Sequence, residues 1–138
     1  MWLNQDKFRV MHIGKHNIHN NYTISVNDLE RVIIRHTCQE KDLGIILTPD
    51  FKFSAQSAHA ATKANAVLSM LKKTFITRGV EIWATLYRTY VRPHLEFAIS
   101  AWRPYLKRDI TVIEKVQQRA TRIPTLLKDL NYNFRLER

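Results

Sequence analysis

Residues 54–75, SAQSAHAATKANAVLSMLKKTF, decide the fold of this chain. Their apolar side chains recur at steps of three and four residues, at Ala60, Ala64, Val67, Leu68, Leu71 and Phe75. This spacing places them on one side of an α-helix, where they can be buried together. The sequence therefore predicts a long helix from Ser54 onwards, with Gly79 after Arg78 as its stop.

Before this helix the sequence has the two-residue period of β-strands. Phe8–Ile13 predicts a short strand, and Tyr22–Val26 alternates and predicts its hairpin partner across a polar loop. Two further β-rich runs follow at Leu29–His36 and Leu43–Leu47. Residues 1–51 therefore predict a small antiparallel sheet.

A second helix is predicted from Val80. It places its large apolar residues at core spacing, at Trp83, Leu86, Tyr87, Tyr90 and Val91. Pro93 is expected to kink or break this helix, and Leu95–Trp102 continues as a helical piece before Pro104. Among the aromatic residues, Trp83, Tyr87 and Tyr90 are predicted to pack in the core, whereas Trp102 and Tyr105 are predicted to be partly exposed.

A third helix is predicted from about Asp109 to Arg122, with Asp109 as its N-cap and Pro124 ending it. Its apolar side holds Ile110, Ile113, Val116 and Ala120. The predicted fold class is α+β. A small N-terminal antiparallel β-sheet (residues 1–51) is followed by a three- to four-helix bundle (residues 52–138).

Positive charge is concentrated in the predicted helical part. The 138 residues carry a net charge of +10, from 22 Lys and Arg against 12 Asp and Glu. Residues 1–51 hold six of each sign, so residues 52–138 hold sixteen basic and six acidic residues. A basic excess of this kind favours polyanionic partners.

The third predicted helix carries a basic stripe. Its members, at spacings of seven, four and three, are Arg108, Lys115, Arg119 and Arg122. At 3.6 residues per turn they lie within roughly 60° of one another. Such a face can present cations to a phosphate backbone, although an ordinary solvated helix surface gives the same pattern.

No catalytic pattern stands out in this sequence. It has no Asp-Asp pair to hold two metal ions and no glycine-rich phosphate loop. Three histidines, His12, His16 and His19, raise a zinc site with the distant Cys38, but they lack the paired spacing of structural zinc sites. We therefore expect no metal ligands and no resident cofactor in this chain.

Cys38 is the only cysteine, residues 1–6 lack the pattern of a signal peptide, and no apolar run is long enough to cross a membrane. The sequence thus predicts an intracellular protein, nuclear or cytoplasmic, without membrane association.

Eight segments resemble, in order, the region downstream of the catalytic palm in reverse transcriptases of non-LTR (LINE-type) retrotransposons, of the jockey and chicken-repeat groups. The segments are Lys7–Lys15, Tyr22–Ile24, Glu40–Ile45, Ala61–Asn65, Leu86–Arg88, Val91–Ala98, Trp102–Ile110 and Ile113–Thr121. They cover nearly the whole chain. In one departure, Arg122-Ile123-Pro124 is one residue shorter than the corresponding family motif.

The resemblance implies roles for particular residues. Lys7 corresponds to the motif D lysine, and Asp42-Leu43-Gly44 to the primer-grip turn that positions the primer 3′ end. From Ser54 onwards the chain corresponds to thumb helices that pack along the template-primer duplex. The residues expected to contact nucleic acid are Lys63, Lys72, Lys73, Arg88, Arg92, Lys107, Arg108, Lys115, Arg119 and Arg122.

The same resemblance places the family's catalytic aspartates, which use Mg²⁺ in the complete enzyme, before Met1. It therefore implies a truncated RNA-directed DNA polymerase that is inactive alone and binds an RNA/DNA or DNA duplex. The missing palm, or another protein, is a further expected partner along an exposed strand edge.

Two alternatives remain from the sequence. One is an expressed relic, or a domesticated copy, that serves as a protein interaction module through Trp102, Tyr105 and strand edges. The other is a small metal-dependent nuclease, which rests on the histidines alone.

Overall fold

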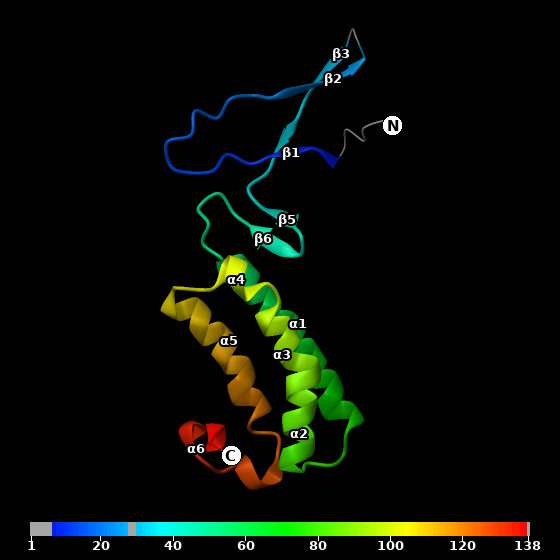
Figure 1. The fold of residues 1–138 in the computed structure, drawn as a ribbon, viewed down its shortest axis with the longest axis vertical. Helices are drawn as coiled ribbons and strands as arrows, with labels where there is room; N and C mark the ends of the chain where they lie inside the picture. Colours follow the sequence, from blue (N-terminus) through cyan, green and yellow to red (C-terminus); the bar gives the residue numbers. More distant parts are fainter. Residues whose placement is uncertain (1–6, 28–29, 138) are drawn as a thin grey trace. The chain divides into compact units, whose positions relative to one another are not determined.

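The computed structural model describes residues 7–27 and 30–137, and the chain divides into two units, Met1–Lys52 and Phe53–Arg138 (Figure 1). Strands fill the first unit and helices the second, which confirms the predicted α+β class. Residues 1–6 and the predicted strand residue Leu29 lie outside the described residues.

The described strands of the first unit are short. They are β1 (Arg9–Val10), β2 (Thr23–Asn27), β3 (Glu30–Ile33), β4 (Arg35–His36), β5 (Glu40–Asp42) and β6 (Ile45–Leu47). Antiparallel pairs form between β2 and β3, with Ile24 opposite Val32, and between β5 and β6. In contrast, β1 and β4 pair in parallel, with Val10 opposite His36.

The predicted hairpin between the first strand and Tyr22–Val26 is therefore wrong, because β2 pairs with β3 instead. Neighbouring strands can pair across a short connection, which costs less loop-closure entropy than pairing across the polar loop between β1 and β2. The predicted single sheet is replaced, in the described residues, by separate two-stranded ladders.

The turn between β5 and β6 has a defined geometry. Asp42 lies opposite Ile45, so Leu43 and Gly44 form a two-residue connection. Both have positive φ angles, 45° and 88°, as a type I′ hairpin turn requires. The left-handed conformation is easy for Gly44 and strained for Leu43, whose side chain is 88% exposed.

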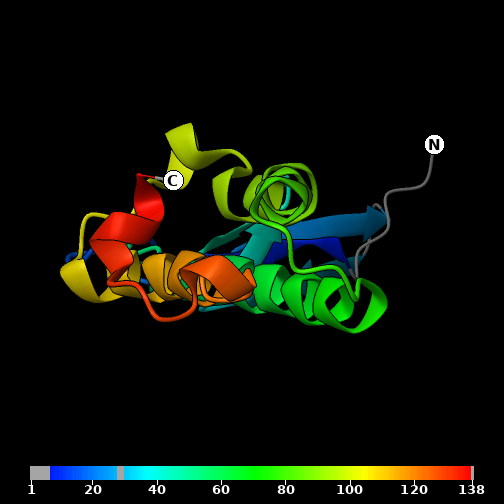
Figure 2. The same ribbon diagram turned by 90° about the horizontal axis from the view of Figure 1, so that it is seen from below.

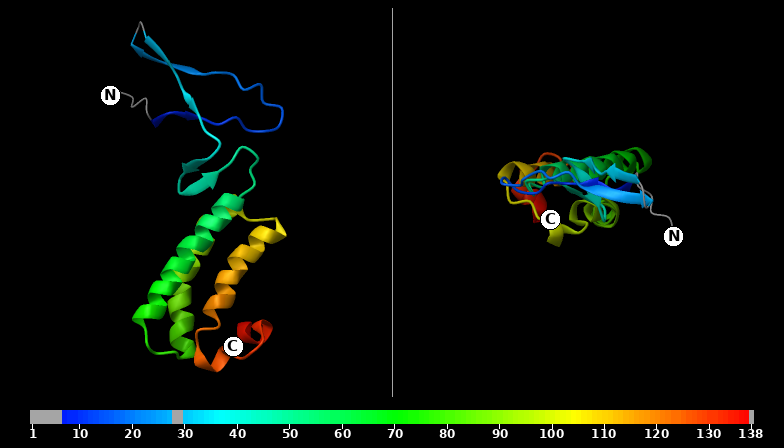
Figure 3. Two further views of the ribbon diagram at one scale, coloured as in Figure 1. Left: turned by 180° about the vertical axis from the view of Figure 1, so that it is seen from behind. Right: turned by 90° about the horizontal axis from the view of Figure 1, so that it is seen from above.

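The helices of the second unit form a bundle. They are α1 (Ser54–Thr74), α2 (Val80–Leu86), the π-helical turn η2 (Tyr87–Val91), α3 (Arg92–Glu96), α4 (Ile99–Trp102), α5 (Lys107–Ala120), the 3₁₀ turn η3 (Thr125–Leu127) and α6 (Tyr132–Leu136). The long helices α1 and α5 lie side by side as one layer, and α2, η2 and α3 form a rod packed on that layer (Figure 2). The same layer is seen from behind in the left view of Figure 3.

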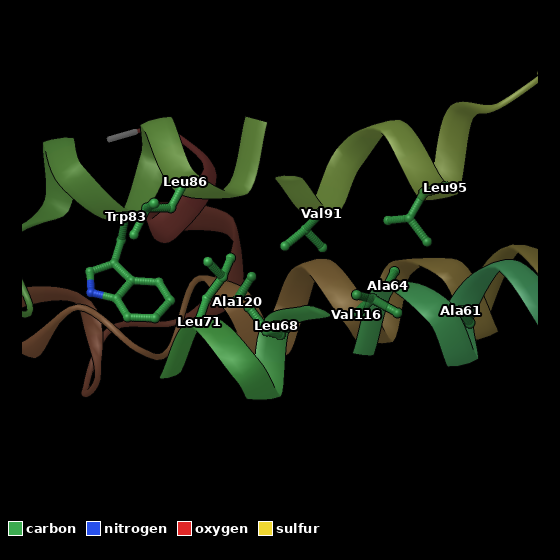
Figure 4. Packing of buried hydrophobic residues seen from close by; sticks show 10 residues of the cluster. All are labelled: Ala61, Ala64, Leu68, Leu71, Trp83, Leu86, Val91, Leu95, Val116 and Ala120. Carbon is green, nitrogen blue, oxygen red and sulfur yellow. The ribbon is translucent and has the colours of Figure 1, made fainter. Parts of the chain in front are cut away.

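The core lies between this rod and the α1–α5 layer. Trp83 and Leu86 of α2 sit near Leu71 at one end, while Val91 and Leu95 sit over Ala64 and Val116 at the other (Figure 4). Small residues on α1, such as Ala61 and Ala64, let the rod approach closely. The buried Trp83 also donates its indole N–H to the Thr77 carbonyl oxygen at 2.7 Å.

The first helix ends earlier than predicted. It stops at Thr74, because Phe75 is extended, and Gly79 precedes α2 as its N-cap residue. Gly79 has φ −69° and ψ 141°, a conformation open to any residue, so the positive φ of a helix-stopping glycine is absent here. The prediction that Gly79 stops the first helix was therefore wrong.

Pro93 interrupts the second helix as predicted. The Arg92 N–H donates to the Tyr87 carbonyl five residues back, which is the π-helical pattern. Proline has no N–H and its ring collides with the carbonyl four residues earlier, so one wider turn ahead of it relieves the contact. The helix continues as α3 with Pro93 in its first turn.

The segment after Pro93 departs from prediction. Leu95–Trp102 is not one helical piece, because Ala98 adopts a left-handed conformation with φ 51° and separates α3 from α4. This break turns Trp102 inwards, where it is fully buried and donates its indole N–H to the Phe97 carbonyl at 2.6 Å. The predicted exposure of Trp102 was wrong, while Tyr105 is 64% exposed as predicted.

Predictions for Tyr90 and for the ends of the third helix were also wrong. Tyr90 is 52% exposed, because the extra residue of the π turn moves it off the core face. The third helix starts at Lys107 and ends at Ala120, so Asp109 lies inside its first turn and Leu106 takes the N-cap position. Pro124 does not end this helix, which has already stopped at Ala120; it is the N-cap residue of η3.

Candidate nucleic-acid interface

The contact between α1 and α5 sets the geometry of the candidate site. Arg108 donates to the Ser54 hydroxyl at 2.9 Å, and Arg119 donates to the Asn65 side-chain oxygen at 3.0 Å. Both pairs are 54 residues apart in sequence, so the two helices run in the same direction. Eleven residues separate the two contacts on each helix, which corresponds to about 16 Å along the axis.

Asp109 connects the two helices from the buried side. Its side chain is almost fully buried and accepts a hydrogen bond from the Ser54 hydroxyl at 2.8 Å. Arg108 lies 3.5 Å from the same carboxylate but remains 68% exposed. The Ser54 hydroxyl thus donates a hydrogen bond to the buried Asp109 carboxylate and accepts one from the exposed Arg108 guanidinium. These bonds hold Arg108 against α1.

Arg108, Lys115 and Arg119 of the predicted basic stripe lie on the side of α5 that faces this contact, and Arg122 follows in the turn after α5. We call these four residues the seam cations. All four are exposed. Arg119 bonds to a neutral amide, and Lys115 and Arg122 have no carboxylate partner among the described residues. Among residues 53–137, Arg108 is the one seam cation with an ion-pair partner, so most of the charge on this stripe is not neutralised there.

A row of short, uncharged side chains on α1, which we call the neutral ridge, runs beside the seam cations. Its members are Ala58, Thr62, Asn65 and Ser69, at spacings of four, three and four residues. At the helical period they fall within roughly 60° of one another. None of these side chains is long, so a bulky ligand can approach the cations without steric hindrance. Sequence analysis overlooked this ridge, although the run of small residues at helical spacing was visible.

The other residues expected to contact nucleic acid are placed differently. Lys72 lies in the last turn of α1 on the side of Asn65, whereas Lys63 lies about 160° from Asn65 around the helix. Lys73 and Lys107 are both exposed. Around their helices, Lys73 lies about 100° from Lys72 and Lys107 lies about 100° from Arg108.

Arg88 and Arg92 belong to a separate place. They line a groove of about 700 Å³ between the rod and the opposite flank of α5. Arg92 forms a 2.6 Å ion pair with Glu96, and this hydrogen bond raises the pKa of Arg92. The ten expected contacts therefore do not form one surface: the four seam cations and Lys72 group together, and the two groove arginines stand apart.

Lys7 and the Asp42-Leu43-Gly44 turn belong to the first unit. Lys7 is exposed, and the tip of the turn is exposed at Asp42 and Leu43. No described contact of either residue indicates a catalytic role.

His12 and His36 of the first unit join in a hydrogen-bonded group. His12 Nε2 lies 2.8 Å from His36 Nδ1, and His12 Nδ1 lies 2.9 Å from the side-chain oxygen of Asn17. Within residues 7–27 and 30–137, no three His, Cys, Asp or Glu side chains are placed to hold a metal ion. The described helices also include none that is long and apolar enough to span a bilayer.

Comparison with known proteins adds no relative. No protein-family model, no curated protein and no solved structure matches the chain.

Proposed function

We propose that this chain is the nucleic-acid-binding, thumb-side piece of a reverse transcriptase of the non-LTR type, and that it holds the backbone of an RNA/DNA or DNA duplex against the α1–α5 layer. The observation that supports the proposal is the row of seam cations, exposed and largely unpaired, beside a ridge of small neutral side chains. The order of motifs along the chain supports the assignment to a reverse transcriptase.

The dimensions of the seam suit a phosphate backbone. Arg108 and Arg119 are held about 16 Å apart along α5, and successive phosphates of one B-DNA strand rise about 3.4 Å each. Hydrogen bonds to Ser54 and Asn65 fix the two guanidinium groups, which reduces the side-chain entropy lost on binding. Lys115 lies between them on the same flank of α5.

The alternative of a protein interaction module named Trp102, Tyr105 and strand edges; of these, Trp102 is fully buried and is not accessible to a partner. Tyr105 is exposed, so it remains available for contact with another protein.

A salt titration tests the proposal. We expect the full chain to bind a DNA duplex with a logarithmic salt slope of about −3 to −4, because each of four neutralised phosphates contributes about −0.9. Lys115→Gln removes one seam cation and should make the slope shallower by about one unit. Fluorescence anisotropy at several salt concentrations measures both values.

Lys63→Gln is the matched control, because it removes the same charge from the far side of α1. Its slope should stay within error of the parent chain. Equal slopes for the Lys115 and Lys63 variants, or binding that salt does not weaken, would contradict the proposal.

A further inference from the structure

The groove on the other flank of α5 is a second candidate site, distinct from the seam. Its apolar lining includes Leu95, Ile99, Ile110, Ile113, Leu127 and Leu136. The lining runs along α5 from Ile110 to Ala120, about 15 Å. Figure 2 shows α3 and α6 on the same side of the α1–α5 layer, and both contribute residues to the groove's lining.

The charges of the groove do not balance. Four arginines line it, Arg88, Arg92, Arg103 and Arg135, against two acids, Glu96 and Glu114. Arg92 and Glu96 neutralise each other. Two of the remaining cations lie near opposite ends of the groove, since Arg103 precedes α5 and Arg135 bonds to Thr121 just after it.

The excess positive charge of the groove is energetically unfavourable at Arg135, because this side chain is buried. It is 95% buried, since only 5% of its surface is exposed, and its hydrogen bonds go to the Thr121 hydroxyl at 3.2 Å and the Leu130 carbonyl at 2.8 Å. Among the described residues no carboxylate lies within ion-pair distance of it. A buried guanidinium with only neutral partners is stabilised by any anion that enters the groove beside it.

We infer that this groove binds an acidic amphipathic helix from a partner protein. A helix of three turns matches its length, an apolar stripe at i, i+3/i+4 and i+7 matches its floor, and flanking carboxylates match the arginines near both ends. A single-headed anionic amphiphile would satisfy the cations near one end only, so the charge distribution favours the helix. This inference does not depend on nucleic-acid binding at the seam.

The test uses the full chain and a fluorescent synthetic peptide that carries a leucine stripe flanked by glutamates. A peptide of the same composition in permuted order, and one with lysines for the glutamates, are the control probes. Arg103→Glu should weaken binding of the acidic peptide about tenfold or more. Lys63→Glu makes the same kind of charge change outside the groove and should leave affinity unchanged.

Ile110→Ser provides an uncharged second variant. Its side chain is 41% exposed, so the change perturbs the groove floor with little effect on folding, which thermal unfolding verifies. It should also weaken the acidic peptide, whereas the seam variant Lys115→Gln should not.

Several outcomes would overturn the inference. Equal binding of the permuted or lysine peptide would show that the stripe or the charge is irrelevant. Displacement of the peptide by a DNA duplex would make the groove part of the nucleic-acid surface. Binding of decanoate without binding of the peptide would assign the groove to a small amphiphile.

Discussion

Asp109 is the residue on which the α1–α5 contact depends most. Its carboxylate is buried, accepts a hydrogen bond from the Ser54 hydroxyl at 2.8 Å, and lies in the first turn of α5, where the helix dipole stabilises a negative charge. Asp109→Ala should therefore lower the free energy of unfolding by about 2 kcal/mol, because the contact loses a hydrogen bond to a charged group.

Urea denaturation measures this change. Asp109→Asn keeps an acceptor oxygen and should cost less, and the exposed Asp129→Ala should cost almost nothing. A loss at Asp129 as large as that at Asp109 would argue against the buried contact.

Tyr87 gives a pH-dependent signature. Burial raises the pKa of this phenol from its usual value of 10 to about 12. Since the folded pKa lies above the unfolded one, the neutral phenol's contribution to stability is complete below pH 10 and is lost as pH rises towards 12.

The tyrosinate absorbance of the parent chain minus that of Tyr87→Phe measures the titration of this group alone. The difference should rise near pH 12 in the folded protein and near pH 10 after denaturation. A folded-state midpoint near 10 would show that Tyr87 is not packed against the core.

At the level of elements, the π-helical turn η2 accommodates Pro93, which follows it in α3. The wide turn lets the proline ring avoid the carbonyl four residues earlier. Deleting the exposed Thr89 would restore α-helical spacing and bring that collision back, at about 3 kcal/mol. The same deletion combined with Pro93→Ala should be much less destabilising.

Chemical denaturation of the single and double variants measures the coupling between the two changes. Additive effects would mean that the π turn has another cause.

The elements also show what the sequence could reveal. Local spacing predicted the helix from Ser54, the helix from Val80 and the interruption at Pro93, because apolar periodicity and proline geometry act within a few residues. It did not predict the break at Ala98, the burial of Trp102 or the position of Asp109. These depend on contacts with residues distant in sequence, such as Ser54, which no local pattern contains.

The same limit applies to the candidate site. The stripe on α5 follows from helical period alone. That α1 would lie beside it with a neutral ridge, and that Arg88 and Arg92 would face a different groove, follows only from tertiary packing.

At the scale of the whole molecule, the proposed binding of nucleic acid and the addition of nucleotides require different charged residues. In the proposed function, basic residues after Phe51 would contact phosphates, whereas the sequence has no Asp-Asp pair to position two metal ions. We therefore expect the purified chain, given Mg²⁺, nucleotides and an annealed primer, to bind the primer-template and leave the primer unextended. A gel-based extension assay measures this, with an active reverse transcriptase as the positive control. Extension above background that persists after further purification would contradict the proposal.

The parallel course of α1 and α5 has a consequence for the order of folding. Arg108 and Arg119 of α5 can meet Ser54 and Asn65 of α1 only after the helices between them have brought the chain back to the start of α1. Contacts of such high sequence separation form slowly and late. During synthesis on the ribosome, α1 would emerge well before α5, so the seam between them, and with it the proposed grip on a polyanion, would be completed only after α5 has followed.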